Sequence, residues 1–186
     1  MATIRIISAS IREGKKSNRI ALYLQQLITT HKLAEVEMLD LSDYNFPLFT
    51  ERLKFQAQPL PQAIEFAEKV RSADGIIIVT PEYNGGYPAA LKNAIDLLVE
   101  EWKHKPIAIS TVSAGAFAGS QSIVSLQFSL WKIGAYTVPA MFPVPNVEST
   151  YSEEGAAKDP SGSDKRALSF VNELLWFVKA KTAVPH

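Results

Sequence analysis

The sequence feature that most constrains the fold is the segment Gly75-Ile-Ile-Ile-Val-Thr80, whose four central residues are all aliphatic. Its length suits a β-strand and is far short of the ~20 apolar residues that a membrane span needs. A strand that is apolar on both faces is typical of the centre of a parallel sheet, where helices cover both sides. The segment therefore predicts an α/β domain with this strand in the middle of its sheet.

Shorter strand patterns alternate with helical patterns on both sides of this central segment. We predict strands over residues 3–8, 35–41, 75–80, 106–112 and 136–141, and helices over residues 18–31, 61–73, 88–100, 120–133 and 164–180. In the second helix, Ile64, Ala67 and Val70 form the expected buried stripe. Residues 143–163, rich in proline, serine, glycine and glutamate, are predicted to be a long surface loop. Strands that alternate with helices imply right-handed crossovers and one parallel sheet.

The composition excludes several classes of function. Nineteen basic residues balance nineteen acidic ones, which argues against a nucleic-acid-binding protein that depends on overall positive charge. The absence of cysteine excludes disulfides, thiolate catalysis, iron–sulfur clusters and cysteine-ligated zinc. The histidines, His31, His104 and His186, have no metal-ligand spacing. Because neither a membrane span nor a signal-peptide pattern is visible, we expect a soluble cytoplasmic protein with one domain.

The loops that follow the strands are the places to look for a site, because parallel α/β sheets bind ligands at the carboxyl ends of their strands. The first loop, Ser8 to Asn18, brings hydroxyls and cations to the start of a helix, where unpaired N–H groups attract anions. Its one glycine, Gly14, does not make a G-x-G-x-x-G fingerprint, and Ala9 and Lys16 break the Walker A pattern. A solvated loop with a serine helix cap is an equal alternative.

The second loop, residues 80–88, follows the central strand directly. Gly85-Gly86 permits unusual backbone angles and lets a ligand approach the backbone closely, and Tyr83 and Tyr87 could lie against a planar ring. A hairpin-like turn with aromatic anchors is the alternative, which the loop's position between a buried strand and a helix weakens. For Glu82, an ion pair or a carboxylate at a helix end is favoured over a general acid.

The third loop, residues 113–119, consists mainly of small residues that let backbone N–H groups reach a ligand, and Phe117 could cover that ligand. Tight strand-to-helix packing would require the same small residues, so this motif alone is weak. Asp40, near the end of the second strand, is interpreted as structural because the glycine fingerprint is missing. No serine stands in a G-x-S-x-G nucleophile elbow. Three loops suited to a ligand, without a nucleophile, a metal set or a clear acid, indicate that a bound cofactor performs the chemistry.

With these loops in view, the chain resembles the NAD(P)H-dependent FMN reductase family, which comprises flavodoxin-like quinone, azo-dye and chromate reductases. Pro81-Glu-Tyr-Asn84, followed by Leu91-Lys-Asn-Ala-Ile-Asp96, is similar to the most specific signature of that family. Ala9-Ser-Ile-Arg12 with Ser17-Asn18 resembles its first loop, in which glycine usually stands in place of Ala9. Ser113-Ala-Gly115 resembles its third loop.

The resemblance implies a flavodoxin-like three-layer sandwich with a five-stranded parallel sheet in the order 2-1-3-4-5, and a single FMN-binding domain over residues 1–186. It implies that FMN lies at the carboxyl ends of the strands. The implied cofactor contacts are Ser10, Arg12, Ser17 and Asn18 at the phosphate, Pro81, Glu82, Tyr83, Asn84 and Gly85 beside the ring and ribityl chain, and Ser113 and Gly115 at the polar edge of the ring. No side chain is implied to be a catalytic acid or base.

The reaction implied by the resemblance is hydride transfer from NADPH or NADH to bound FMN, followed by reduction of a small-molecule acceptor, which would be a quinone, an azo dye, a metal oxyanion or a flavin. A flavodoxin-like electron carrier is the first alternative, but such carriers are typically strongly acidic, whereas this chain has no net charge. A non-catalytic binding domain that kept the fold is the second. Flavin absorbance and NAD(P)H oxidation would separate the three.

The helix predicted near residues 89–99 bears on assembly. It carries more apolar side chains than one sheet-facing stripe requires, namely Leu91, Ala94, Ile95, Leu97 and Leu98. Because the matching helix of the family packs against a partner, we expect a homodimer or a homotetramer. An unusually buried helix in a monomer is the alternative.

Overall fold

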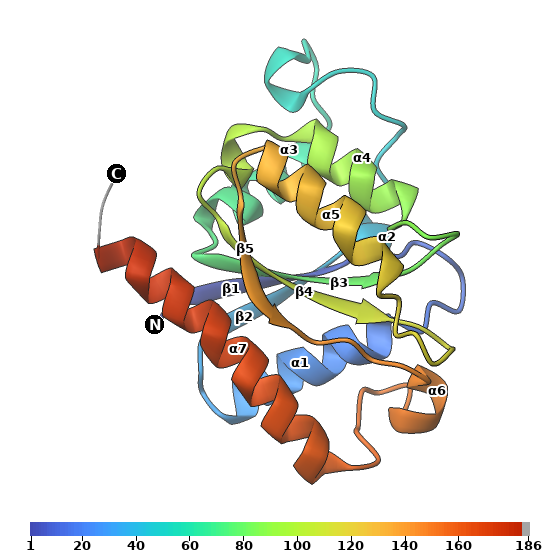
Figure 1. The fold of residues 1–186 in the computed structure, drawn as a ribbon. Coiled ribbons are helices and arrows are strands. Elements are labelled where there is room, and N and C mark those ends of the chain that lie inside the picture. The colour runs from blue at the N-terminus through green and yellow to red at the C-terminus, as the bar shows by residue number, and fades with distance from the viewer. Residues whose placement is uncertain (184–186) are drawn as a thin grey trace.

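The computed structural model describes residues 1–183, so His186 lies outside the described residues, and it shows three layers (Figure 1). The middle layer is one sheet made of β1 (Thr3–Ser8), β2 (Glu35–Asp40), β3 (Gly75–Pro81), β4 (Pro106–Val112) and β5 (Tyr136–Met141). All neighbouring strands are parallel and their order is β2-β1-β3-β4-β5. The predicted flavodoxin-like order is therefore confirmed, and the aliphatic segment is the central strand.

Helices cover both faces of the sheet (Figure 1). α1 (Asn18–Thr30) and α7 (Pro160–Ala183) pack on one face, and α3 (Pro61–Ser72), α4 (Ala89–Leu97) and α5 (Gln121–Lys132) pack on the other. The short helices α2 (Leu41–Tyr44) and α6 (Val147–Thr150) and the 3-10 turns Leu53–Phe55 and Glu100–Trp102 complete the described elements. Within residues 1–183, no helix combines the length and hydropathy needed to cross a membrane.

Strand β3 owes its central place to side chains buried on both faces. Ile77 and Val79 belong to the core beneath α1 and α7, whereas Ile76 and Ile78 belong to the core beneath α3, α4 and α5. Side chains alternate between the faces of a strand, so an unbroken aliphatic run is buried on both. Gly75 begins this strand where a Cβ atom would lie 2.8 Å from Val178 Cγ2, which shows how closely α7 approaches the sheet.

Two sequence predictions about packing are wrong. Ile64 is 40% exposed, because α3 instead turns Ala63, Phe66, Ala67 and Val70 inward. Residues 143–163 are not a surface loop throughout: Val144, Val147 and Tyr151 are buried, α6 forms inside the segment, and α7 already begins at Pro160. These apolar side chains join the core beneath α1 and α7.

The apolar side chains that were predicted to be in excess on α4 are all buried within the chain. Leu91, Ala94, Ile95, Leu97 and Leu98 are each at most 8% exposed and belong to the core of this layer. The predicted reason for oligomerisation, an excess of apolar surface on this helix, is therefore wrong. Helix α4 is the unusually buried helix of the alternative interpretation.

One lysine lies in the core, at the end of the sheet opposite the carboxyl edge. Lys105 directly precedes β4, is 5% exposed, and donates hydrogen bonds through Nζ to the carbonyl oxygens of Arg71, at 3.0 Å, and Ala73. Burial lowers the pKa of Lys105 to about 8, because the charged form loses its hydration.

We expect the free energy of unfolding to rise by roughly 1–3 kcal/mol between pH 8 and pH 10 because of Lys105. The unfolded lysine keeps its proton up to the ordinary pKa of 10.5, whereas the folded lysine releases it near pH 8. The unfolded state thus binds more protons in this window, so stability increases with pH. Urea unfolding at several pH values measures the effect. The variant Lys105→Met should lose the increase, and identical pH profiles for the two proteins would contradict the assignment.

Candidate functional site

The loops after β1, β3 and β4 meet at one pocket of about 340 Å³ on the carboxyl edge of the sheet, which we call the edge pocket. Parallel strands place their carboxyl ends at the same edge, so segments far apart in the sequence become neighbours there. Six of the eleven predicted cofactor contacts line this pocket: Arg12, Ser17, Pro81, Glu82, Tyr83 and Ser113.

The other five predicted contacts lie around the edge pocket without lining it. Ser10 is fully buried and its hydroxyl lies 2.7 Å from the Tyr83 hydroxyl. Asn18 accepts a hydrogen bond of 3.4 Å from the Ser8 hydroxyl, and the Gly115 carbonyl accepts one of 2.7 Å from the Ser113 hydroxyl.

Asn84 and Gly85 form the tip of a tight turn in which the N–H of Tyr83 donates to the carbonyl of Gly86 at 2.8 Å, and the N–H of Gly86 donates back at 3.1 Å. The turn needs φ angles of +52° at Asn84 and +80° at Gly85, which glycine adopts without strain and asparagine tolerates. The hairpin-like alternative for the second loop is therefore correct for these residues, although Tyr83 still faces the edge pocket.

The end of the edge pocket at α1 is suited to an anion. Ser17 stands at the N-cap position of α1 and is 2% exposed, but its hydroxyl makes no capping hydrogen bond and has no partner among the described residues. A buried hydroxyl without a partner costs free energy, so a ligand that supplies an acceptor is stabilised there. The start of α1 adds N–H groups and the positive end of the helix dipole. Arg12 is exposed, lines the same pocket, and pairs with no carboxylate in residues 1–183.

The two lysines of the first loop are held by carboxylates. Lys15 binds the carboxylate of Asp40 at 2.5 Å and the hydroxyl of Ser42 at 2.8 Å, and Lys16 pairs with Glu148 at 2.9 Å. Asp40 also accepts from the N–H of Ser42 at 3.0 Å and so caps α2, which confirms its structural role. Arg12 is therefore the cation that remains available to a bound anion.

Two side chains of the second loop form hydrogen bonds with helix α5. The Glu82 carboxylate accepts a 3.0 Å hydrogen bond from the N–H of Gln121, the first residue of α5, so the helix-end alternative favoured for Glu82 is confirmed. The Tyr87 hydroxyl lies 2.8 Å from the hydroxyl of Ser129. Tyr87 thus contacts α5 and does not line the edge pocket, contrary to the suggestion that it could lie against a ligand ring.

Ala9 does not obstruct the edge pocket. It is fully buried in the core beneath α3, α4 and α5, with Ile7 and Leu41 in the same cluster, and its N–H donates to the carbonyl of Val79 at 3.0 Å. Its methyl group belongs to the core and not to the pocket lining, so alanine in place of glycine leaves the space for a ligand unchanged.

Sequence reasoning missed the wall formed by α6. Val147 and Glu148 line the edge pocket, and the N–H of Val147 donates to the carbonyl of Ser113 at 3.1 Å. The N–H of Ser113 in turn donates to the carbonyl of Val144 at 3.0 Å. The signal that could have revealed this wall is the presence of three apolar residues, Val144, Val147 and Tyr151, in a segment whose composition is otherwise typical of a loop; all three are buried.

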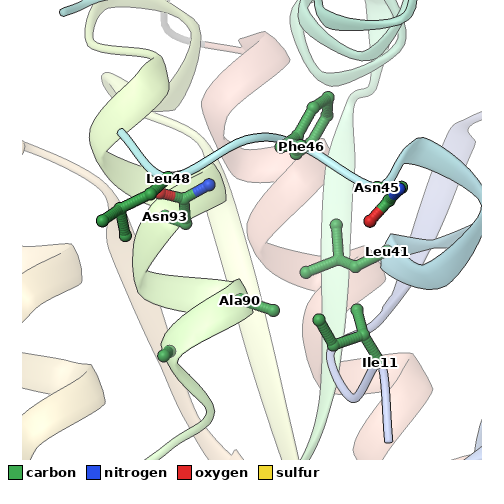
Figure 2. A pocket seen from close by; sticks show the side chains of 8 residues that line it. Ile11, Leu41, Asn45, Phe46, Leu48, Ala90 and Asn93 are labelled. Atoms are coloured by element: carbon green, nitrogen blue, oxygen red, sulfur yellow. The ribbon is translucent and has the colours of Figure 1, made fainter. Parts of the chain in front are cut away.

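A second pocket, of about 200 Å³ and mainly apolar, lies between the first loop, α2 and the start of α4 (Figure 2). Figure 2 shows Leu48 on the loop segment that crosses above Asn93 and Ala90 of α4. Asn93 fixes this segment, because its side chain donates to the Pro47 carbonyl at 2.8 Å and accepts from the N–H of Phe49 at 2.6 Å. The sequence analysis did not predict this pocket, because the segment between α2 and α3 carries no motif suited to a ligand.

Among residues 1–183, no three histidine, aspartate or glutamate side chains are grouped so that they could hold a metal ion. The edge pocket offers a set of hydroxyls, one available arginine, a helix start and a tyrosine. That arrangement can bind a phosphorylated, planar molecule, but it contains no nucleophile with an activating base.

Comparison with known sequences shows which protein family this sequence matches. The sequence model described as NADPH-dependent FMN reductase matches residues 2–149. An NAD(P)H-dependent FMN reductase of Schizosaccharomyces pombe is 32% identical over 128 residues, which cover 67% of this chain and 63% of the relative. One from Saccharomyces cerevisiae is 33% identical over 67% of this chain and 71% of its own length. A quinone reductase of Escherichia coli is 36% identical over 60% of each chain. The match thus spans less than two thirds of the first and third of these relatives.

Comparison with solved structures supports the fold. A flavoenzyme NAD(P)H:acceptor oxidoreductase from Paracoccus denitrificans has a TM-score of 0.75 at 23% identity, over 96% of this chain and 98% of its own. An oxidoreductase from Corynebacterium diphtheriae has a TM-score of 0.76 at 21% identity, over 97% and 98%. A flavodoxin variant from Pseudomonas aeruginosa has a TM-score of 0.58 at 13% identity, over 93% and 99%. The architecture of the three layers is thus that of flavodoxin-like proteins.

Proposed function

The chain belongs to the NADPH-dependent FMN reductase family, and we propose that it is an FMN-dependent NAD(P)H oxidoreductase whose cofactor binds in the edge pocket. The observation that carries the proposal is the buried hydroxyl of Ser17, which has no partner among the described residues and stands at the start of α1 beside Arg12. A phosphate monoester supplies both the acceptor oxygens and the negative charge that this end of the pocket lacks.

The residues of the edge pocket fit FMN from end to end. Arg12 and Ser17 hold the phosphate, and Asn18 places the first turn of α1 next to it. Ser10 holds the hydroxyl of Tyr83 at 2.7 Å and so sets the position of the tyrosine ring at the pocket wall. Pro81 and Glu82 line the side of the second loop, and Asn84 and Gly85 form the tip of its turn beside them. Ser113 of the third loop lines the opposite side, and its hydroxyl donates to the carbonyl of Gly115.

When bound, FMN accepts a hydride from NAD(P)H and returns electrons to an acceptor. The role of the chain's own residues is to bind the cofactor, to orient it and to cover it. The ion pairs of Lys15 and Lys16 hold the first loop against β2, α2 and α6, so Arg12 meets the phosphate on a fixed loop. The backbone hydrogen bonds of Ser113 with Val144 and Val147 hold the third loop against α6. We assign no side chain as a proton donor or acceptor. Quinones, azo dyes, metal oxyanions and free flavins are the acceptors we propose.

Titration of the apo-protein with FMN and with riboflavin tests the proposal, with quenching of flavin fluorescence as the measurement. We expect FMN to bind at least 10-fold more tightly than riboflavin, because hydrogen bonds to a charged group contribute roughly 1.5–3 kcal/mol each and 1.4 kcal/mol is tenfold. Oxidation of NAD(P)H with a quinone should then proceed only in the presence of FMN. If neither flavin binds, the third interpretation, a binding domain that kept the fold, replaces this one.

The kinetics should follow a ping-pong pattern. The three loops form a single pocket, so the nicotinamide donor and the acceptor are expected to use the same space in turn. Initial rates measured at several concentrations of NAD(P)H and of a quinone should give parallel double-reciprocal lines. Intersecting lines would mean that both substrates are bound at once and that a shared site is wrong.

The proposal has three further parts. We propose that residues 1–186 form a single domain, which the single sheet with one core on each face supports. We propose a cytoplasmic location, since reduced nicotinamide donors are supplied inside cells. We also propose that the enzyme assembles as a homodimer or homotetramer, although α4 does not provide the surface for it.

A further inference from the structure

A pocket beside α6 takes no part in the proposed function. It has a volume of about 370 Å³, within the range of pockets that bind small organic molecules. Val147 and Glu148 of α6 line the edge pocket, whereas the next two residues, Ser149 and Thr150, line this one, which we call the rear pocket. Most of its other lining residues lie between positions 158 and 166, where α7 begins. The two pockets therefore lie against the same short helix.

Two cations line the rear pocket, and neither has a carboxylate partner. They are Lys158 and Arg166, both exposed, and no ion pair joins either of them to another residue within positions 1–183. The acidic residues Glu148 and Glu153 bind cations of the first loop and of α1 instead, at 2.9 Å and 3.2 Å. The positive charge of the rear pocket is thus available to an anion from solution.

The backbone around the rear pocket holds both cations in place. The guanidinium of Arg166 lies 5.2 Å from the centre of the Phe142 ring and donates one hydrogen bond, of 2.8 Å, to the Pro143 carbonyl. Four of the five N–H donors of an arginine remain after that bond. The N–H of Lys158 donates to the Thr150 carbonyl at 2.9 Å, which fixes the backbone of the lysine and leaves its ammonium group free.

The rear pocket also contains hydrogen-bond acceptors. Asp159 is the one carboxylate that lines it; its Oδ1 accepts from the N–H of Gly162 at 3.1 Å and caps α7, whereas its Oδ2 accepts no hydrogen bond from residues 1–183. The hydroxyls of Ser149 and Thr150 donate to the Asn146 carbonyl, at 2.9 Å and 3.1 Å, so their oxygens can still accept. A matching ligand therefore carries hydroxyl donors as well as negative charge.

We propose that the rear pocket binds a phosphorylated sugar or polyol. Lys158 and Arg166 bind the phosphate, and Asp159 accepts hydrogen bonds from the hydroxyl groups. A phosphate monoester carries between one and two negative charges and several acceptor oxygens, which suits two separate cations with many donors, whereas a lone carboxylate needs only one arginine. The proposal concerns a pocket other than the edge pocket and does not depend on the binding of FMN.

Calorimetric titration with glucose 6-phosphate tests the inference. The protein is first saturated with FMN, so that the phosphate of FMN occupies the end of the edge pocket at Arg12. Glucose 6-phosphate should bind with a dissociation constant of about 1 mM or lower, as a few charge-assisted hydrogen bonds allow. Glucose, which lacks the phosphate, and inorganic phosphate, which lacks the sugar, should each bind about 10-fold more weakly or worse. Absence of saturable binding, or equal affinity for one of the two fragments, would overturn the proposed ligand class.

Variants of the two cations locate the binding site. Lys158→Ala and Arg166→Met should each weaken glucose 6-phosphate about 10-fold, because each removes a charged donor. Methionine keeps an apolar side chain over the Phe142 ring, so Arg166→Met preserves that packing. The matched control is Lys165→Ala, since Lys165 is an exposed lysine of α7 that does not line the rear pocket. Unchanged affinity in both cation variants, or an equal loss in the control, would contradict the inference.

FMN titration of the same variants separates this inference from the proposed function. Lys158→Ala should bind FMN as tightly as the parent, because Lys158 does not line the edge pocket. If the parent bound no FMN, the proposed function would fail, and glucose 6-phosphate would then be titrated into the protein without FMN. Binding that Lys158→Ala weakens and Arg12→Ala leaves unchanged would still support the rear pocket, whereas the reverse pattern would place the phosphate in the edge pocket and overturn the inference.

Discussion

Replacing Gly155 by alanine is expected to lower the free energy of unfolding by roughly 2–4 kcal/mol. Gly155 has a φ of +86°, and a Cβ atom there would lie 2.7 Å from the N atom of Tyr23 and 2.9 Å from the carbonyl oxygen of Arg19. Both are backbone atoms of α1, which cannot move aside as a flexible side chain could. The segment would have to leave α1, and the hydrogen bond from Arg19 to the Tyr151 carbonyl, now 2.7 Å, would be strained.

Gly14→Ala is the matched control for Gly155→Ala. Gly14 also has a positive φ, +64°, but nothing lies within 4 Å of the Cβ atom that alanine would add. This variant should lose only the conformational strain, about 1 kcal/mol. Urea unfolding followed by circular dichroism measures both losses. Equal losses in the two variants would show that the close contact with α1 contributes nothing and that the packing of this segment has been misjudged.

Replacing Arg12 by alanine is expected to weaken FMN binding by about 10- to 100-fold, because a hydrogen bond to a charged partner contributes roughly 1.5–3 kcal/mol. Arg12 is the cation of the first loop that no described carboxylate neutralises, whereas Lys15 and Lys16 are paired with Asp40 and Glu148. Riboflavin lacks the phosphate, so its affinity should be the same for the parent and for Arg12→Ala. Fluorescence quenching measures both ligands.

Arg52→Ala serves as the control, since Arg52 is an exposed arginine in the loop between α2 and α3. It should leave both affinities unchanged. If Arg12→Ala weakened FMN and riboflavin equally, the residue would act on the loop as a whole and not on the phosphate. If it weakened neither, Arg12 would be a solvated surface cation, and the assignment of the phosphate to Ser17 and the start of α1 would fall with it.

The sheet was predictable from the sequence because its signals are local. A strand with an aliphatic run such as residues 76–79 can bury the side chains on both of its faces only between two layers of helices. The alternation of strands and helices along the chain then leaves few possible topologies. The three loops at the carboxyl edge followed from that topology. In the first loop, residue type alone directed attention to Arg12 and Ser17, whereas Ser113 was expected only from the resemblance to the FMN reductase family; all three line the edge pocket.

The incorrect predictions concern side chains whose burial is determined by packing between segments that are distant in the sequence. In α3, Ala67 and Val70 are buried as predicted, but the helix turns Ala63 and Phe66 toward the core in place of Ile64, and only the position of the sheet decides this. Helix α6 has four residues, too few for a helical period to be visible, and its composition is typical of a loop.

Exposure likewise depends on the three-dimensional arrangement. The apolar residues of α4 and those of α5 look alike in the sequence, yet α4 lies in the core while Phe128 and Trp131 face outward. Tyr87 and Tyr83 are equally suited to contact a planar ring, and the hydrogen bond of Tyr87 with Ser129 separates their roles. Such distinctions require the neighbours of each side chain, which a single sequence does not contain.

The visible absorption of the purified protein, recorded under argon before and after addition of NADPH or NADH, tests the central claim most directly. The edge pocket is held to bind FMN and to admit a nicotinamide donor. We therefore predict that the protein carries FMN, or takes it up on incubation, and that the absorption band of oxidised flavin disappears when the donor is added and returns when a quinone is added. A protein that stays colourless in FMN, or whose bound flavin neither nicotinamide reduces, would contradict the account.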